Sequence, residues 1–384
     1  MRTAMLPYGH QSIDEDDINA VSEVLRGDFI TQGPKVEEFE GAIAAYCGAK
    51  YAVVVSSGTA ALQVACEAAG IKKGDEVITT PLTFVATAAA IVRCGARPRF
   101  VDIRLDNLGL NFEELDWQSI PYHATAIMPV DFAGLPCDLD EIMMFAHENP
   151  KQDLLVIEDG CHAFGATYNG RKIGSVADMT IFSFHPVKAI AVGEGGAITT
   201  NDLGLYKRML RLRHHGIVKQ GESSWYYEIP QLGYNFRLTD IQCALGLSQL
   251  KKVDRFIARR QWIARMYEEA FAEVPELIIP MRTPQISHAY HIYVVQLQLD
   301  RLRWSRNQVI DALRAKNIGA TVHYTPLHLQ TFFQKTFGYK KGEFPNAEKY
   351  YDSAVTLPIF PAMTDSDVYD VIQAVTEVIG ACRR

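Results

Sequence analysis

The chain has 384 residues, of which 48% are hydrophobic and 22% are charged, and this length favours two domains over a single hydrophobic core. A net charge of −7 excludes a general attraction to nucleic acid or to an anionic membrane, and no apolar run approaches the roughly 20 residues of a membrane span. Seven scattered cysteines without a Cys-x-x-Cys pair, together with an N-terminus that lacks an apolar signal region, predict reduced thiols in a cytoplasmic protein.

In chain order, two expected helices are followed by strands that alternate with helices. The first helix ends at Gly27, a loop covers residues 28–33, and Pro34 opens the second helix. Short apolar, β-branched runs that end in turn residues are typical of buried strands. The expected strands are 51–55, 76–79, 98–102, 125–130, 154–158, 179–184 and 197–200, and the helices between them include 60–69, 83–94, 139–147 and 203–215. This alternation predicts a mostly parallel sheet with helices on both faces.

A long helix is expected from Arg237 to about Val274, because apolar residues recur at helical spacing and no Gly or Pro follows Gly246. It would carry the chain from the first domain to the second. The remainder has strand patterns over 290–299 and 320–324 and helical patterns over 305–316 and 365–379. We therefore expect a large domain over residues 1–250 and a smaller α/β domain over residues 251–384.

Two side chains that suit one cofactor follow neighbouring predicted strands. Lys188 lies on a tight loop, and a lysine in a partly dry site becomes a neutral nucleophile, although most loop lysines are solvated surface groups. Asp159 closes an apolar strand, where an isolated carboxylate is more often a helix cap or a structural ion pair. A lysine that forms a Schiff base and a carboxylate that keeps a pyridine nitrogen protonated are the pair that pyridoxal 5'-phosphate (PLP) requires.

A phosphate site is predicted at the same edge of the sheet, beyond the carboxyl ends of its strands. The turn Ser56-Ser-Gly-Thr59 offers hydroxyls and free N–H groups at a helix start, although an ordinary helix cap explains it equally well. Ser183 could supply another hydroxyl. Phe84 could stack on a flat ring, although a lone aromatic residue more often belongs to the core. No P-loop, metal-binding motif or dinucleotide fingerprint occurs.

Several segments, in order from about residue 5 to residue 380, resemble those of one family. They are Ile30-Thr-Gln-Gly33, Ser57-Gly-Thr-Ala-Ala-Leu62, Thr83-Phe-Val-Ala-Thr87, Ile157-Glu-Asp159 with His162, Ser183-Phe-His-Pro-Val-Lys188, Gly193-Glu-Gly-Gly196 and Gly233-Tyr-Asn-Phe-Arg237. The family is that of the nucleotide-sugar aminotransferases (DegT/DnrJ/EryC/StrS). Tyr8, the run from Asn235 to Lys252 and Val322-His-Tyr-Thr-Pro-Leu327 are similar to the UDP-4-amino-4,6-dideoxy-N-acetyl-β-L-altrosamine transaminases of pseudaminic acid synthesis.

The resemblance implies the PLP-dependent aspartate-aminotransferase fold (type I), with a seven-stranded, mostly parallel sheet domain and a smaller C-terminal α/β domain. It implies that Lys188 binds PLP covalently and later shuttles the proton. The implied cofactor-binding residues are Gly58, Thr59, Phe84, Asp159, His162, Ser183, Lys188 and Asn235. Asn235 would reach the phosphate of the neighbouring subunit's cofactor, which implies a homodimer. The implied nucleotide-sugar contacts are Tyr8, Asp28, Phe29, Ile30, Thr31, His323 and Tyr324, and Arg237 is a candidate for the donor carboxylate.

The activity that this resemblance implies is amino transfer from L-glutamate to C4 of a UDP-4-keto-6-deoxy-N-acetylhexosamine, with pyridoxamine phosphate as the intermediate form of the cofactor. Two positions depart from the family pattern: Gly160-Cys161 stands for Ala-Ala, and His328 replaces an aromatic residue of the altrosamine subgroup. The alternatives are another nucleotide-linked keto sugar, or a sugar dehydratase, which has histidine in place of Lys188. A DNA-reading regulator would need a further helix-turn-helix module and a basic face. The hexose, its stereochemistry and the nucleotide stay open.

Overall fold

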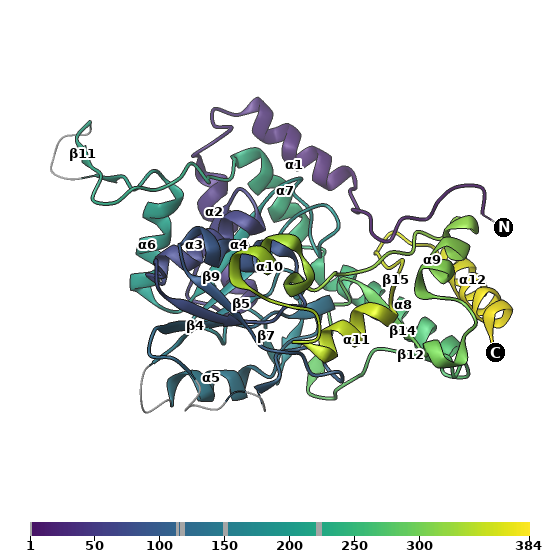
Figure 1. The fold of residues 1–384 in the computed structure, drawn as a ribbon. Coiled ribbons are helices and arrows are strands. Elements are labelled where there is room, and N and C mark those ends of the chain that lie inside the picture. The colour runs from purple at the N-terminus through teal and green to yellow at the C-terminus, as the bar shows by residue number, and fades with distance from the viewer. Residues whose placement is uncertain (1, 113–114, 116–119, 149–152, 220–224) are drawn as a thin grey trace.

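The computed structural model describes residues 2–112, 115, 120–148, 153–219 and 225–384 (Figure 1). Its centre is a seven-stranded sheet in the order β1-β9-β8-β5-β4-β2-β3. These strands are β1 (Tyr51–Val55), β2 (Glu76–Thr79), β3 (Arg97–Phe100), β4 (Ala124–Met128), β5 (Leu155–Asp159), β8 (Met179–Ser183) and β9 (Gly196–Thr200). Only β9 runs antiparallel to its neighbours in this sheet. The predicted mostly parallel sheet is confirmed.

Helices cover both faces of this sheet, and the two-residue alternation of the strands divides the core between them. Val54 packs on one face with Phe39 of α2 and Leu139 of α5. Val53 and Val55 pack on the other face, against helices α3, α4 and α6. The large-domain helices are α1 (Glu15–Arg26), α2 (Pro34–Cys47), α3 (Gly58–Ala68), α4 (Val85–Arg93), α5 (Leu139–His147), α6 (Leu203–Arg213) and α7 (Asp240–Leu250). Burial on both faces explains why the strands read as continuous apolar runs.

The expected helix from Arg237 to Val274 is wrong in two respects. It begins only at Asp240, because Thr239 caps it through a reciprocal pair with Gln242. It also breaks after α7, and α8 (Val253–Phe271) starts a new helix. At the break, the ammonium of Lys252 pairs with Asp14 and Asp17 at the start of α1. The ion pairs and the packing of α7 on α1 and α2 hold α7 to the large domain, so the chain turns before it enters the second domain.

The second domain packs helices on a small antiparallel sheet. The strands of this sheet are β12 (Leu277–Ile278), β14 (Tyr293–Leu297) and β15 (Ala354–Leu357), and the helices after α8 are α9 (Arg306–Ala315), α10 (Thr331–Phe337), α11 (Pro345–Ser353) and α12 (Asp365–Cys382). The strand expected over 320–324 is reduced to one bridge between Thr321 and Thr356. Leu6 lies in the core of this domain. The first residues of the chain therefore pack on the C-terminal domain, although α1 and α2, which follow them, belong to the large domain. The division at residue 250 stays a prediction.

Short strands complete the fold. β6 (Thr167–Tyr168), β7 (Arg171–Lys172) and β13 (Ile286–Ser287) form a third sheet, and β10 (Val218–Lys219) pairs with β11 (Tyr227–Glu228). Figure 1 shows β11 at the end of an arm that projects from the large domain. Among the described helices, none is both long and apolar enough to cross a membrane.

Candidate active site

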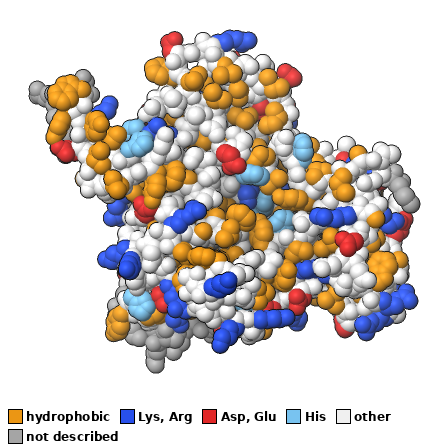
Figure 2. Space-filling model, turned by 45° about the horizontal axis from the view of Figure 1, so that its top comes forward, with side chains coloured by type: hydrophobic (Ala, Val, Ile, Leu, Met, Phe, Trp, Pro, Cys, Tyr) orange, Lys and Arg blue, Asp and Glu red, His pale blue; other side chains and the backbone are white. Residues whose placement is uncertain are grey.

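A cavity of about 390 Å³ opens at the carboxyl edge of the large sheet, where the second domain meets it. Ten of the predicted site residues line this cavity: Tyr8, Gly58, Thr59, Phe84, Asp159, His162, Ser183, Lys188, His323 and Tyr324. Figure 2 shows histidine side chains gathered near the middle of one face, in keeping with the four histidines of the cavity wall. Loops after β1, β2, β5 and β8 therefore bring together groups that the sequence keeps apart.

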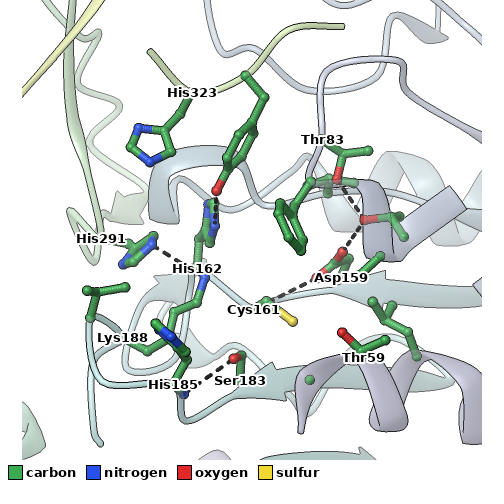
Figure 3. A pocket seen from close by; sticks show the side chains of 18 of the residues that line it. Thr59, Thr83, Asp159, Cys161, His162, Ser183, His185, Lys188, His291 and His323 are labelled. Atoms are coloured by element: carbon green, nitrogen blue, oxygen red, sulfur yellow. Dashed lines mark hydrogen bonds between the residues drawn. The ribbon is translucent and has the colours of Figure 1, made fainter. Parts of the chain in front are cut away.

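Lys188 reaches into the cavity from the loop after β8 (Figure 3). Its Nζ lies 3.4 Å from Nε2 of His291. Burial lowers the pKa of the Lys188 amine to about 8, while the thiol of Cys161 and the carboxylate of Asp159 act in the opposite direction. At neutral pH a minor fraction of this amine is therefore neutral and nucleophilic, but that fraction is far larger than for an ordinary surface lysine.

Asp159 approaches the same cavity from the end of β5 (Figure 3). Its carboxylate accepts a hydrogen bond from the Thr87 hydroxyl at 2.7 Å and one from the Cys161 N–H at 3.2 Å. Thr87 in turn contacts the Thr83 hydroxyl at 2.7 Å. No ion pair among the described residues includes Asp159, although its residue is only 5% exposed. The carboxylate is thus oriented by hydroxyl and amide donors and keeps oxygen lone pairs for a cationic ligand.

The turn after β1 forms an anion-binding end of the cavity. Ser57 caps α3 by accepting the N–H of Ala60 at 3.0 Å. The N–H groups of Gly58 and Thr59 lie in the first turn, where a helix offers no acceptor of its own. Ser183 lies so close that a Cβ on Gly58 would stand 2.9 Å from the Ser183 Cβ. The backbone N–H groups of Gly58 and Thr59 and the Thr59 and Ser183 hydroxyls therefore lie at the same end of the cavity.

The opposite wall is aromatic, and both domains contribute to it. The Phe84 ring lies 5.8 Å from the Tyr324 ring, and the Tyr324 hydroxyl lies 3.4 Å from Nε2 of His162. The Tyr8 and His323 rings are 5.0 Å apart. Phe84 is 54% exposed although it lines the cavity, so one face of its ring is free to cover a flat ligand.

The other predicted site residues lie outside this cavity. Asn235 is exposed, and the guanidinium of Arg237 lies 2.8 Å from Nδ1 of His214. In the exposed loop over residues 28–31, Thr31 pairs with Thr239 in an isolated bridge. Asp28 and Phe29 border a separate groove of about 960 Å³ beside α1, α2 and α7. Within one copy of the chain these residues do not meet Lys188, and their roles stay predictions.

The profile of the DegT/DnrJ/EryC1/StrS aminotransferase family matches residues 11–376. This chain belongs to that family. The spore coat polysaccharide biosynthesis protein SpsC of Bacillus subtilis is 43% identical to it, with 98% of each chain covered. The UDP-4-amino-4,6-dideoxy-N-acetyl-β-L-altrosamine transaminase of Campylobacter jejuni is 36% identical, with 98% of this chain and 100% of the relative covered.

Solved structures agree with the family assignment. PseC of Helicobacter pylori, an aminotransferase involved in pseudaminic acid biosynthesis, has a TM-score of 0.92 at 30% identity, with 98% and 100% of the two chains covered. The PLP form of the putative sugar aminotransferase Spr1654 of Streptococcus pneumoniae has a TM-score of 0.91 at 30% identity, with 98% and 99% covered. The chain is therefore a PLP-dependent sugar aminotransferase of fold type I.

The residues of the cavity fit PLP in size, charge and chemistry. Lys188 provides a partly neutral amine, and Asp159 provides a carboxylate without a cationic partner among the described side chains. The start of α3 offers free N–H groups for a phosphate, and Phe84 offers an open ring face. These features lie around a single cavity, as one small cofactor with a charged phosphate and an aromatic ring requires.

The two departures from the family pattern fall in different places in this aminotransferase. Cys161 lines the cavity next to Asp159, so the Gly160-Cys161 sequence does change the cavity wall. His328 is fully buried, contacts the Glu348 carboxylate at 2.9 Å and lies outside the residues that line the cavity. It packs against Phe344, with ring centroids 4.8 Å apart. The substitution at residue 328 therefore acts on the packing of the second domain.

Sequence reasoning missed two groups of the aminotransferase that bear on Lys188. His291 lines the cavity, and the buried guanidinium of Arg260 binds the backbone on both sides of the Lys188–His291 contact. His291 lies just before the apolar strand β14, and Arg260 lies on the buried, mostly apolar face of α8, where a polar residue is normally paired within the core. The sequence offered one signal for Arg260, a charged residue on the otherwise apolar face of a predicted helix. That signal does not indicate which groups the guanidinium contacts.

Gly196 at the start of β9 lies very close to the turn at Ser57 and Gly58, and this contact can be tested. A Cβ on Gly196 would stand 2.6 Å from the Ser57 carbonyl oxygen and 2.8 Å from the Gly58 nitrogen. We expect Gly196→Ala to lower the free energy of unfolding by about 2 kcal/mol, since backbone atoms must move. It should also weaken PLP retention. Urea unfolding and cofactor titration measure both.

Gly41→Ala is the matched control, because a Cβ there meets nothing within 4 Å and the residue lies inside helix α2. Alanine in a helix interior is favoured over glycine by about 1 kcal/mol, so this variant should unfold at equal or higher urea concentration. If Gly196→Ala is as stable as the unchanged chain, the tight contact between β9 and the Ser57 turn is wrong.

Proposed function

We propose that this aminotransferase transfers the amino group of L-glutamate to C4 of a UDP-linked 4-keto-6-deoxy-N-acetylhexosamine. The observation that carries the proposal is the single cavity that holds Lys188 and Asp159 in a chain 36% identical, over nearly its whole length, to an altrosamine transaminase. Similarity to PseC supports the same substrate class. In such a reaction the 4-keto sugar is the amino acceptor, and the 4-amino sugar is the product.

PLP, when bound, supplies an electron sink for the carbanion at the amino-bearing carbon. Lys188 would hold the cofactor and, as a free amine, would take a proton from one carbon and return it to another atom. Asp159, held by Thr87, would keep negative charge against the ring nitrogen. Gly58, Thr59 and Ser183 would hold the phosphate. Phe84 would cover one ring face, and His162 would lie at the ring's edge.

The sugar would lie on the side of the cavity formed by the second domain. Tyr8, His323 and Tyr324 line that side and carry hydroxyl or imidazole groups. Burial lowers the pKa of His323 to about 4, so this imidazole is neutral at physiological pH. A neutral imidazole can donate and accept hydrogen bonds at the same time, which suits sugar hydroxyls.

We also propose a homodimer whose cavities are completed by the other copy. Asn235, Arg237 and the loop over residues 28–31 do not reach the cavity of their own chain, although the resemblance assigns them to it. The arm near β11 carries exposed apolar side chains, which on a lone surface mark a contact site. The exposed apolar residues of the loop and the arm are Phe29, Ile30, Trp225, Tyr226, Tyr227, Ile229 and Leu232.

Mixed dimers test this arrangement. Lys188→Ala and Asn235→Ala chains should each be impaired alone, since each removes one half of every site. If the sites are shared, unfolding and refolding the two variants together should restore one intact site in each heterodimer. About a quarter of the activity of the unchanged enzyme should return, because half of the dimers are mixed and each has one of its two sites intact. Light scattering should report a dimer. A monomer, or no recovery on mixing, would contradict the shared site.

The substrate assignment is tested by incubating the purified enzyme with L-glutamate and a panel of 4-keto nucleotide sugars, with mass spectrometry of the products. Amination of the UDP-linked N-acetyl sugar is expected. Amination of another nucleotide-linked keto sugar would favour the second candidate, which the 43% identity to SpsC supports. Loss of water without amination would indicate a dehydratase, against which the lysine at position 188 argues. No amination of any sugar would refute the proposal.

A further inference from the structure

His291, just before β14 of the second domain, makes direct contact with the amine of Lys188. Its Nε2 lies 3.4 Å from the Lys188 Nζ (Figure 3). The His291 residue is only 6% exposed, and its ring centroid lies 4.2 Å from that of His162. No described residue forms a hydrogen bond with Nδ1 of His291. The imidazole is therefore fixed on one side by packing and directed on the other at the lysine.

The direction of this hydrogen bond follows from the unpaired ring nitrogen. A buried N–H without an acceptor is rarer in proteins than a buried acceptor without a donor. This favours the tautomer of His291 with its proton on Nε2, from which Nε2–H can donate to the lone pair of the neutral Lys188 amine. Burial lowers the pKa of His291 well below its usual value, and the nearby Lys188 adds to this effect. The imidazole is therefore neutral, and its Nε2–H can donate only to the deprotonated form of the amine, which prevails above the Lys188 pKa of about 8.

Arg260 of α8 fixes the backbone on both sides of this contact. Its guanidinium donates to the carbonyl oxygens of His291 at 3.1 Å and of Val187, the residue before Lys188, at 3.3 Å. The same group also donates to Ile359 at 2.8 Å and to Tyr290 at 3.2 Å. Arg260 is 1% exposed, and no carboxylate among the described residues pairs with it. The planar guanidinium of Arg260 therefore links the backbone before Lys188, in the large domain, to the backbone of His291, in the small domain.

We propose that His291 is a positioning residue that donates a hydrogen bond from Nε2 to the free amine of Lys188 and, held by Arg260, aims that amine into the cavity. The inference rests on the proton-transfer role proposed for Lys188. The aimed lone pair is the one that accepts a proton from the substrate carbon, so its orientation sets the rate of that step. The titratable groups that face the lysine and histidine are Asp159, Cys161, His162, Arg260 and His323.

The first test measures the lysine without any sugar. The cofactor-free full chain is trace-labelled with acetic anhydride over a range of pH, and the peptide that contains Lys188 is quantified by mass spectrometry. Labelling should be half-maximal near pH 8 in the unchanged chain, since only the neutral amine reacts. His291→Phe keeps the site buried but removes the donor to the neutral amine, so the midpoint should move upward by about one pH unit. His291→Gln retains an N–H donor and should move it less.

His288→Gln is the matched control. His288 lies three residues away and is also buried, but its Nδ1 accepts the Tyr290 N–H at 2.8 Å and it does not line the cavity. The Lys188 midpoint should be unchanged in this variant. An unchanged or lower midpoint in His291→Phe would overturn the proposal. An equal upward shift in His288→Gln would overturn it as well, because the effect would then be general to the segment.

The second test uses the PLP-loaded enzyme and L-glutamate alone. The maximal rate of the first half-reaction should fall about tenfold in His291→Phe, the effect of one hydrogen bond, while the glutamate concentration for half-maximal rate stays constant. Glutamate deuterated at the α-carbon should show a larger isotope effect, since proton transfer becomes slower. A change confined to glutamate affinity would contradict a positioning role. If the unchanged enzyme does not react with glutamate, the proposed function fails, and the labelling series still decides the role of His291.

Discussion

Replacing Lys188 with alanine is expected to abolish transamination, with a fall of about 10⁴-fold in the rate of each half-reaction. The variant loses both the covalent bond to PLP and the amine that moves the proton. The fold should persist, because the Lys188 side chain faces a cavity and makes one long contact, to His291. Lys188→Arg should be equally inactive, since a guanidinium stays protonated at any accessible pH.

The measurement that isolates this effect is borohydride reduction followed by peptide mass spectrometry. The unchanged enzyme should carry the reduced cofactor on the Lys188 peptide, and Lys188→Ala should carry it nowhere. Lys172→Ala is the control, because the Lys172 ammonium pairs with Asp254 at 2.8 Å on the protein surface, where an ion pair contributes little. Full activity in Lys188→Ala, or labelling at another lysine, would remove the basis of the proposed mechanism.

The second large effect is expected for Asp159→Asn. Asparagine has the shape of aspartate, and its amide oxygen can keep the hydrogen bond from Thr87 at 2.7 Å. It carries no negative charge, so in the proposed arrangement the ring nitrogen of the cofactor would lose the partner that keeps it protonated. Removing one preorganised electrostatic partner in a closed site costs about 10³-fold in rate. PLP should still attach to Lys188, so the loss appears in the rate and not in cofactor content.

Asp178→Asn serves as the control for this charge. Asp178 precedes β8 at the opposite edge of the same sheet, where its carboxylate accepts the Val156 N–H at 2.8 Å. Asparagine can accept the same hydrogen bond, so the rate should stay near that of the unchanged enzyme. Stopped-flow measurement of the glutamate half-reaction compares the two variants. Equal rates for Asp159→Asn and the unchanged enzyme would show that Asp159 does not face the ring nitrogen.

The strands of the large sheet could be predicted from the sequence because they are local and buried on both faces. Residues 51–55 and 76–79 form strands at the predicted positions, since continuous β-branched runs have few other stable conformations. The break after Leu250 could not be predicted. Lys251 and Lys252 are good helix formers, and what turns the chain is a pair of carboxylates more than 200 residues earlier.

The cavity residues that the large domain contributes could also be predicted from the sequence. Asp159 and Lys188 follow predicted strands of one mostly parallel sheet, Ser183 lies at the end of such a strand, and the carboxyl ends of parallel strands meet at one edge. The loop over residues 28–31 and Asn235, which was expected to reach the neighbouring subunit's cofactor, were assigned by resemblance, and Arg237 was chosen because an arginine suits a carboxylate. In one copy of the chain all of them lie outside the cavity. The residue pattern of a segment does not indicate whether it contacts the cavity of its own chain or that of another copy.

The sequence by itself determined the family, the parallel sheet and the lysine–carboxylate pair, because residue type and spacing within a few residues are enough to specify each strand and the turn that follows it. Only the tertiary structure decided what faces the lysine. His291 lies 103 residues after Lys188, whose amine it contacts. Arg260 lies 73 residues after Val187, whose carbonyl oxygen it binds. Burial in a shared interior, and not any local preference, sets these contacts, and burial is also the main cause of the lowered pKa of the Lys188 amine.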